Sequence, residues 1–231
     1  MLIYSHRGES KYAPENTMSA FYLASLMNCD GIECDIRKTK DDKLVLIHDK
    51  SVDRTSNCNG EVSNYTLDKL NICDFGNKNY KGEKIVTLTD FLNYFSDKNI
   101  KLFLEVKESG YEKLIWDTIS KYNISNIEII SFKYDVLNEF RKLSNILKLG
   151  WLVYFISEKE IVDCKKININ QVICLSTALS KLDVKKLRDN SIEIGAWGIK
   201  NKAELERIDN LEIDSVVYDS YYDAKRILKN E

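Results

Sequence analysis

The feature that most limits the possible folds is a regular alternation of short β-branched runs with helical patterns. Such alternation is typical of strand–helix units arranged around a parallel sheet. Eight units can be counted, and this number predicts a closed (β/α)8 TIM barrel. The expected strands are residues 2–5, 31–36, 101–106, 127–131, 147–153, 171–175, 193–197 and 215–218. Helical patterns follow nearly all of them, at residues 16–26, 111–122, 135–143, 158–166, 181–190, 202–208 and 223–229.

The second unit departs from this pattern. Between Asp35 and Leu88 the chain has a hairpin-like segment at 43–48, a polar stretch and two short segments. A long insertion after a barrel strand is usually functional. No linker or change of composition divides the chain. We therefore expect one domain, 1–231, with a small inserted subdomain at about 38–86.

Charge and composition exclude several classes of protein. The 231 residues include 34 Lys plus Arg and 36 Asp plus Glu, which gives a net charge of −2, and the basic residues are dispersed among acidic ones. Nucleic-acid binding relies mainly on clustered cations, so we expect no nucleic-acid partner and no stable membrane association. No apolar run approaches the roughly 18 residues that a spanning helix needs. The first residues lack a secretory signal, so we expect a cytoplasmic protein.

The cysteines show no Cys-x-x-Cys spacing. There are six of them, at positions 29, 34, 58, 73, 164 and 174. A reducing compartment argues against disulfides, and the spacing argues against a zinc site. We therefore interpret all six as packing thiols.

Charged residues gather at the ends of the expected strands, which meet at one mouth of such a barrel. His6 and Arg7 end the first strand and offer a titratable group beside an anion binder. Glu33 and Asp35 end the second strand two residues apart, so both carboxylates project from the same face. Oxygen ligands arranged in this way suit Mg²⁺ or Ca²⁺.

The third strand repeats the same spacing with Glu105 and Lys107. A third carboxylate would join the first pair, and the ammonium would face the same cavity as a phosphate ligand. The alternative is a structural salt-bridge layer between Lys107 and the acids. That alternative explains the balance of charge but not why histidines collect at the same end.

His48 is the only histidine besides His6. It follows the apolar run 44–47 inside the insertion and precedes Asp49. A lone histidine is usually structural. A second one delivered by a long insertion to the same mouth favours a catalytic role.

In these residues the chain resembles the glycerophosphodiester phosphodiesterase family. The matching motifs run from the first expected strand to the seventh, so the resemblance covers nearly the whole chain. They are His6-Arg7-Gly8, Ala13-Pro14-Glu15-Asn16-Thr17, Glu33-x-Asp35, His48-Asp49, Asp53-Arg54-Thr55, Gly60, Thr87-Leu88, Glu105-x-Lys107, Ser131-Phe132 and Trp197.

The resemblance implies a role for each of these groups. Glu33, Asp35 and Glu105 would bind one divalent cation, Mg²⁺ or Ca²⁺, and Arg7 and Lys107 would hold the phosphate. His6 and His48 would act as general acid and base. Trp197 would form a wall for the glycerol moiety, although it can equally belong to the core. The resemblance thus implies catalytic roles for His6 and His48, substrate-binding roles for Arg7, Lys107 and Trp197, and metal-binding roles for Glu33, Asp35 and Glu105.

The resemblance leaves open which histidine is the base and which is the acid. As a working hypothesis we take His6 as the base and His48 as the acid, with a glycerol hydroxyl attacking before water does. The chain also departs from the family pattern in its loops. Lys50 and Val86 replace usual prolines, Cys58 replaces a usual glycine, and Gly198 and Lys200 follow Trp197.

The expected function is hydrolysis of glycerophosphodiesters, such as glycerophosphocholine and glycerophosphoethanolamine, to sn-glycerol 3-phosphate and an alcohol. Two alternatives stay open. One is a lysophospholipase D-type phosphodiesterase that acts on lipid-linked substrates. The other is a non-catalytic barrel that binds a phosphorylated metabolite. The sequence does not decide the alcohol, the cation or the oligomeric state.

Overall fold

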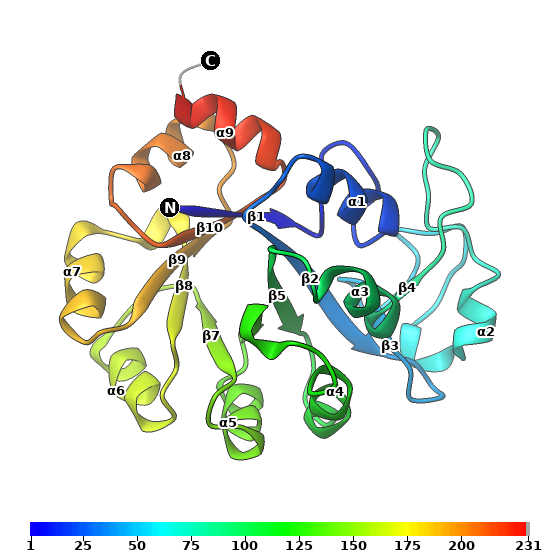
Figure 1. Ribbon diagram of the computed structural model, residues 1–231, viewed down its shortest axis with the longest axis horizontal. Coiled ribbons are helices and arrows are strands. Elements are labelled where there is room, and N and C mark those ends of the chain that lie inside the picture. The colour runs from blue at the N-terminus through cyan, green and yellow to red at the C-terminus, as the bar shows by residue number, and fades with distance from the viewer. Residues whose placement is uncertain (230–231) are drawn as a thin grey trace.

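Eight parallel strands close into the barrel that the alternation predicts, as a computed structural model of the chain shows for residues 1–229 (Figure 1). The ring closes because the first strand pairs on one side with the second and on the other with the last. The barrel strands are β1 (Leu2–His6), β2 (Gly31–Lys38), β5 (Lys101–Val106), β6 (Ile127–Ser131), β7 (Lys148–Val153), β8 (Gln171–Leu175), β9 (Glu193–Trp197) and β10 (Ser215–Tyr218).

Helices surround the barrel on its outer side (Figure 1). They are α1 (Met18–Leu26), α3 (Leu88–Phe95), α4 (Glu112–Ile119), α5 (Tyr134–Leu143), α6 (Glu158–Lys166), α7 (Lys181–Asp189), α8 (Lys202–Asp209) and α9 (Tyr221–Lys229). Short 3₁₀ turns lie at Val62–Asn64, Ile124–Asn126 and Ser176–Ala178. The first helix begins later than expected because Thr17 caps it, its hydroxyl accepting a hydrogen bond from the Ala20 amide. The segment before β5 is the helix α3, which the helical pattern did not predict.

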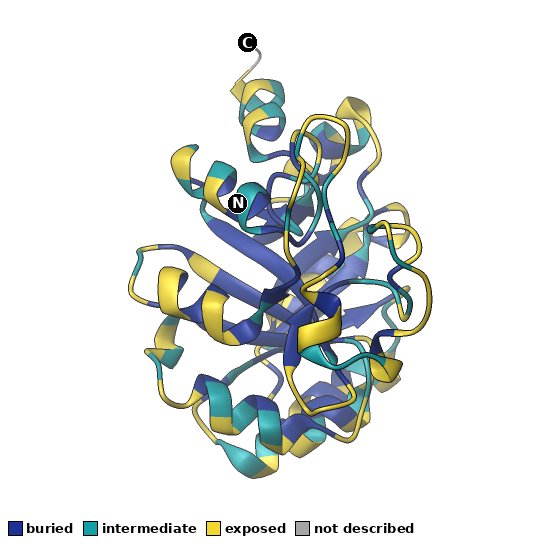
Figure 2. Ribbon diagram, turned by 90° about the vertical axis from the view of Figure 1, so that its right-hand side faces the viewer, coloured by how far each residue is buried: buried dark blue, intermediate teal, exposed yellow. Residues whose placement is uncertain are grey.

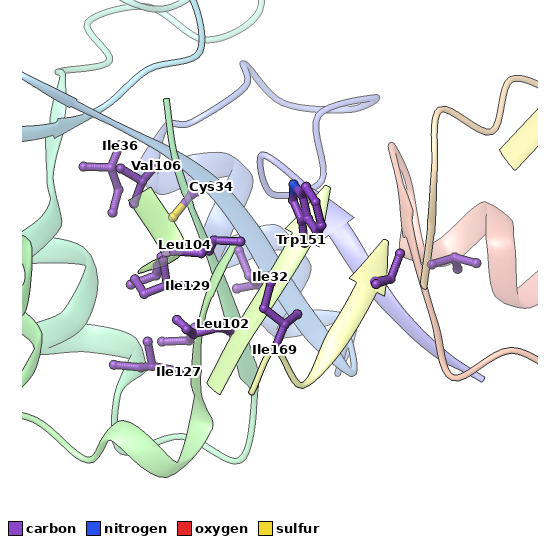
Figure 3. Packing of buried hydrophobic residues seen from close by; sticks show 14 of the residues in the cluster. Ile32, Cys34, Ile36, Leu102, Leu104, Val106, Ile127, Ile129, Trp151 and Ile169 are labelled. Carbon is purple, nitrogen blue, oxygen red and sulfur yellow. The ribbon is translucent and has the colours of Figure 1, made fainter. Parts of the chain in front are cut away.

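Side-chain alternation along the strands creates two cores. On β2, residues Ile32, Cys34 and Ile36 face outward and pack with equivalent apolar residues of the neighbouring strands beneath the helices (Figure 3). The inward-facing set is smaller. Its buried members are Tyr4, Phe103, Ile130, Leu152, Ile173 and Val217. The acids of β2 alternate with its outward residues and therefore point into the barrel.

The insertion builds a third, separate core. It starts on the protruding end of β2, which pairs antiparallel with β3 (Leu44–Leu46), and β3 pairs in turn with β4 (Val86–Thr87). The helix α2 (Leu67–Leu70) lies between these two strands in the chain. The buried residues of this core are Val45, Ile47, Val52, Val62, Leu70, Cys73, Phe75 and Ile85. We propose that the chain is one domain carrying an insertion at about 38–86. The insertion is a subdomain because its buried cluster is separate from the barrel cores.

Burial follows this arrangement (Figure 2). The strands are buried and the helices expose their outer faces, while the loops of the insertion are mostly exposed. Within residues 1–229, no helix has the length and apolar character needed to cross a bilayer.

The expectation that all six cysteines are free packing thiols is wrong for two of them. Cys58 and Cys73 form a disulfide in the insertion, and their Cα atoms lie 5.8 Å apart. The pair is separated by 15 positions, and only the folding of the insertion brings it together. Cys29, Cys34, Cys164 and Cys174 are free and buried, as expected.

The N-terminal end of the barrel holds a buried acid far from the strand ends described above. Glu128 of β6 points inward and is 6% exposed, and its Oε1 atom has no hydrogen-bond partner. Gly150 lies against it, where a Cβ would approach that oxygen to 2.7 Å. Burial, together with repulsion from Glu193, raises the pKa of Glu128 to about 8. The folded protein therefore holds this proton more tightly than the unfolded chain.

We expect Glu128→Gln to flatten part of the pH dependence of stability. Because the pKa of Glu128 is raised on folding, its contribution is present at low pH and is lost as the pH rises toward about 8. Across this range the free energy of unfolding of the variant should rise relative to that of the wild type, by at most ~1.4 kcal/mol per pH unit. Urea unfolding at several pH values measures this, with the exposed Glu139→Gln as control. Parallel curves for wild type and Glu128→Gln would contradict the prediction.

Candidate active site

The strand ends bring the predicted charged residues together at one mouth of the barrel. Strand register places His6 opposite Glu33 and Asp35 opposite Glu105. His48, two residues after β3, reaches the same place from the insertion. A cavity of about 290 Å³ opens there. Its lining includes His6, Arg7, Glu33, His48, Glu105, Lys107, Phe132, Trp197, Lys200 and Asp219.

Three carboxylates cluster at this cavity: Glu33 and Glu105 line it, and Asp35 is buried beside them. Ligand atoms of Glu33, Asp35 and Glu105 all lie within 4.8 Å of one another, and all three residues are buried. Lys107 lies among them, with Nζ 2.7 Å from Glu105 Oε1 and 3.2 Å from Asp35 Oδ1. Asn16 completes the support, since its Nδ2 donates to Asp35 Oδ2 at 2.8 Å. The salt-bridge layer considered as the structural alternative is therefore present around Lys107.

The cations do not neutralise the acids fully. Arg7 and Lys107 face three carboxylates, and Glu33 Oε1 is buried without a hydrogen-bond partner. Burial and repulsion from Asp35 raise the pKa of Glu33 to about 8. Burial alone would raise the pKa of Asp35 as well, but Lys107 and Arg7 outweigh it and lower that pKa to about 2. An all-oxygen donor set with residual negative charge fits a hard divalent cation.

His6 is held by an aspartate at the end of the last barrel strand. Its Nδ1 atom lies 2.7 Å from Asp219 Oδ1, and its Nε2 atom lies 4.0 Å from Glu33 Oε2. Burial would lower the pKa of His6, but the bond to Asp219 and the charge of Glu33 outweigh it and raise that pKa. Asp219 was assigned no role from the sequence. The only signal was its position at a strand end.

His48 is held in the same way by its chain neighbour. Its Nδ1 atom lies 2.7 Å from Asp49 Oδ1, and its carbonyl oxygen accepts hydrogen bonds from Arg37 Nε at 2.9 Å and Nη2 at 2.7 Å. Burial lowers the pKa of His48, with Lys107 and Arg7 adding to the effect. An aspartate thus engages Nδ1 of each histidine, which leaves each Nε2 to face other groups.

A chain of ion pairs links the insertion to the first strand end. Arg54 contacts Asp49 through Nε at 2.6 Å and Glu15 through Nη1 at 2.6 Å. Glu15 also accepts from Arg7 Nη1 at 2.8 Å. Glu15 and Arg54 stand in the family motifs, but neither was assigned a role from the sequence. Together they connect the residue that orients His48 with Arg7.

Arg7 is fixed by its backbone as well as by its side chain. Its φ of 56° lies in the left-handed region, and its amide donates to Glu33 Oε2 at 2.9 Å. Its Nε atom lies 3.3 Å from Asp35 Oδ2. The guanidinium is therefore already engaged by acids at the cavity, where a phosphate oxygen would compete for it.

The opposite wall of the cavity is apolar. Trp197 is half-buried, donates from Nε1 to the Val153 carbonyl at 3.1 Å and meets Phe132 edge to face at 5.2 Å. Tyr154 lies 5.4 Å from both rings. Lys200 is exposed and also lines the cavity.

Comparisons with known proteins identify relatives of this chain. The model of the glycerophosphoryl diester phosphodiesterase family matches residues 6–222. A glycerophosphodiester phosphodiesterase of Caldanaerobacter subterraneus is 31% identical in an alignment that covers 94% of this chain and 93% of that protein. YhdW of Bacillus subtilis is 32% identical in an alignment that covers 95% of this chain and 94% of that protein.

Solved structures share the fold. The structure of an Oleispira antarctica phosphodiesterase in complex with the product sn-glycerol-3-phosphate superposes with a TM-score of 0.93. It is 21% identical, and the match covers 99% of this chain and 97% of that one.

We expect Asp219→Asn to lower the pKa of His6 in the metal-free protein. The carboxylate favours the protonated imidazole through the bond at Nδ1, and an amide does not carry its charge. The chain has two histidines, so the ring-proton resonances can be followed separately in an NMR titration with chelator present. His48, bound to Asp49, is the internal reference. An unchanged titration of His6 would show that Asp219 does not control this imidazole.

Proposed function

The chain belongs to the glycerophosphoryl diester phosphodiesterase family, and we propose that it hydrolyses glycerophosphodiesters by metal-dependent, two-histidine acid–base catalysis. Glycerophosphodiester phosphodiesterase activity follows from the family membership. The proposed substrates include glycerophosphocholine and glycerophosphoethanolamine, and the products are sn-glycerol 3-phosphate and the alcohol. One observation carries the mechanism: two histidines, each held at Nδ1 by an aspartate, line one cavity together with Arg7 and Lys107, beside the cluster of Glu33, Asp35 and Glu105.

Phosphodiester cleavage needs two proton transfers. The attacking hydroxyl must lose a proton, and the leaving alkoxide must gain one. His6 and His48 supply these transfers at Nε2, because Asp219 and Asp49 occupy the Nδ1 side. The aspartates also fix each imidazole ring in one orientation, which lowers the cost of reaching the reactive geometry.

The phosphate is bound by Arg7 and Lys107. Both side chains line the cavity at the edge of the acidic cluster. Arg7 can give two parallel hydrogen bonds to phosphate oxygens, while Lys107 adds a single compact charge. Both cations oppose the charge that grows on the non-bridging oxygens in the transition state.

Glu33, Asp35 and Glu105 would hold one divalent cation, either Mg²⁺ or Ca²⁺. When bound, the cation would supply electrostatic stabilisation to the phosphoryl oxygens. The unpartnered buried Glu33 Oε1 and the raised pKa of Glu33 support such a site. Trp197 would contact the apolar edge of the glycerol moiety from the opposite wall.

We expect purified protein to release glycerol 3-phosphate from glycerophosphocholine or glycerophosphoethanolamine with Mg²⁺ or Ca²⁺, and to lose this activity with a chelator. An enzyme-coupled assay for glycerol 3-phosphate measures both results. Glu33→Gln should abolish cation binding in isothermal titration calorimetry, because it removes a ligand charge from the cluster. No release at high enzyme concentration with either cation would contradict the proposal. Saturable substrate binding without turnover would favour the non-catalytic alternative.

We expect His6→Ala and His48→Ala each to lower kcat by about 10²-fold or more while cation binding is kept, because each removes one proton transfer. A glycerophosphodiester of p-nitrophenol separates the two roles. Its leaving group needs no proton near neutral pH, so the variant without the acid loses less rate on it. If His48 is the acid, as in the working hypothesis, His48→Ala should lose less activity on this substrate than on glycerophosphocholine. If His6→Ala is the variant that loses less, the two roles are exchanged. Equal losses of both variants on both substrates would contradict the acid–base pair.

A second candidate function is cleavage of lipid-linked phosphodiesters. It is favoured by the exposed aromatic residues beside the cavity, since Phe132, Tyr154 and Phe155 are 36%, 60% and 64% exposed. Such rings can bind an acyl chain or a lipid surface. Lysophosphatidylcholine in the same assay, together with vesicle co-sedimentation, distinguishes this function from action on water-soluble diesters. The absence of membrane association expected from the sequence stays a prediction.

A further inference from the structure

The six cysteines differ sharply in accessibility. The four free thiols are fully buried, and burial raises the pKa of Cys29, Cys164 and Cys174 to about 12 in each case. Such thiols react poorly. Cys58, by contrast, is partly exposed and is bonded to buried Cys73. Among residues 1–229, this disulfide is therefore the cysteine site that a thiol reagent in solution can reach.

Cys58 lies in a short loop that also carries Arg54. This loop, residues 52–60, is closed by the Val52 amide, which donates to the Gly60 carbonyl at 3.0 Å. The Gly60 amide donates to Asp53 Oδ1 at 2.6 Å. We call it the Arg54 loop. The disulfide fastens it to Cys73, which belongs to the core of the insertion.

Few other contacts hold this loop to the end of the insertion. Beside the disulfide, the Asn57 amide donates to the Asp74 carbonyl at 3.0 Å, and the Asp74 amide donates to Asn57 Oδ1 at 2.8 Å. Both bonds lie near solvent and add little stability each. Small cores commonly depend on covalent staples for rigidity. The disulfide is thus the covalent constraint on the Arg54 loop, beside the buried Val52 side chain at its start and the hydrogen bond that the Tyr65 hydroxyl donates to the Asn59 carbonyl at 2.6 Å.

The position of this loop matters at the cavity. Arg54 contacts both oxygens of Asp49, at 2.6 and 3.2 Å, and both oxygens of Glu15, at 2.6 and 2.8 Å. Asp49 orients His48, and Glu15 engages Arg7. Displacement of the Arg54 loop would therefore disturb a proton-transfer group and a phosphate ligand together.

We propose that the Cys58–Cys73 disulfide is a redox-sensitive staple that keeps the enzyme in its active arrangement through Arg54. The inference rests on the proposed function of the cavity. The partner is a dithiol reductant. One of its thiolates attacks a sulfur of the pair, its second thiol completes the exchange, and two electrons and two protons pass to Cys58 and Cys73. A disulfide oxidant reverses the reaction with the same balance.

The exposure of the pair suits exchange with a reductant. Exposed disulfides are the labile ones, and they often serve regulation or catalysis. Cys58 is partly exposed and lies in the same loop as Arg54. The remaining cysteines are buried inside the barrel architecture and would not respond.

The test compares the full chain after treatment with oxidised glutathione and after treatment with dithiothreitol. Reduction should lower kcat/KM for glycerophosphocholine by roughly threefold to tenfold, because it removes the cross-link between Cys58 and Cys73, which are 15 positions apart, and so releases the Arg54 loop. Reoxidation should restore the value. The Cys58→Ser, Cys73→Ser double variant should have the lower value under both conditions. Cys174→Ser, which removes a buried thiol, should respond like the wild type.

Limited proteolysis gives a readout that does not depend on catalysis. Reduction should speed cleavage within residues 52–60 in the wild type, while the double variant is cleaved fast in either buffer. Equal kcat/KM in both states, with mass spectrometry after alkylation proving that the disulfide had opened, would overturn the proposal. Failure of the pair to form on oxidation would overturn it too. Absence of activity in every state, with cleavage still redox-dependent, would instead count against the proposed function.

Discussion

The burial of three carboxylates at the mouth of the barrel is the constraint on which the rest of the site depends. Glu33, Asp35 and Glu105 lie within 4.8 Å of one another, and such a cluster is unfavourable without compensating charge. Lys107 and the Arg7 guanidinium compensate in part, and the amide of Arg7 adds a hydrogen bond to Glu33. The same groups then offer ligands for both a cation and an anion, which is what the proposed phosphodiester cleavage requires.

The barrel has three layers of side chains: an outer apolar layer, an inner apolar layer and the charged mouth. Outward residues such as Ile32 and Cys34 pack under the helices and provide most of the apolar burial (Figure 3). The inward middle layer, with Phe103 stacked on Tyr4 at 3.6 Å, closes the barrel below the acids. Polar side chains can therefore occupy the mouth because the other layers carry the stability of the fold.

The sequence predicted what depends on local pattern. All eight strands were expected, because each is a short apolar run between helical patterns, and spacing of two placed Glu33 beside Asp35 on one face. Apart from the helix α3, what it missed depends on contacts between distant segments. Asp219 meets His6 across 213 positions, and Arg54 meets Glu15 across 39. The disulfide was missed for the same reason, since no local spacing indicates that Cys58 and Cys73 meet.

The proposed active site therefore depends on two parts of the chain that are stabilised in different ways. His6, Glu33 and Glu105 project from central strands whose register is fixed by continuous parallel pairing. His48 follows a three-residue strand in an insertion with its own small core. Its alignment with the barrel relies on Arg37 at its carbonyl and on the Arg54 ion pairs. Local opening costs least free energy where few apolar contacts are buried. The proposed catalysis should consequently be most sensitive to the insertion, although most of the charged groups stand on the barrel.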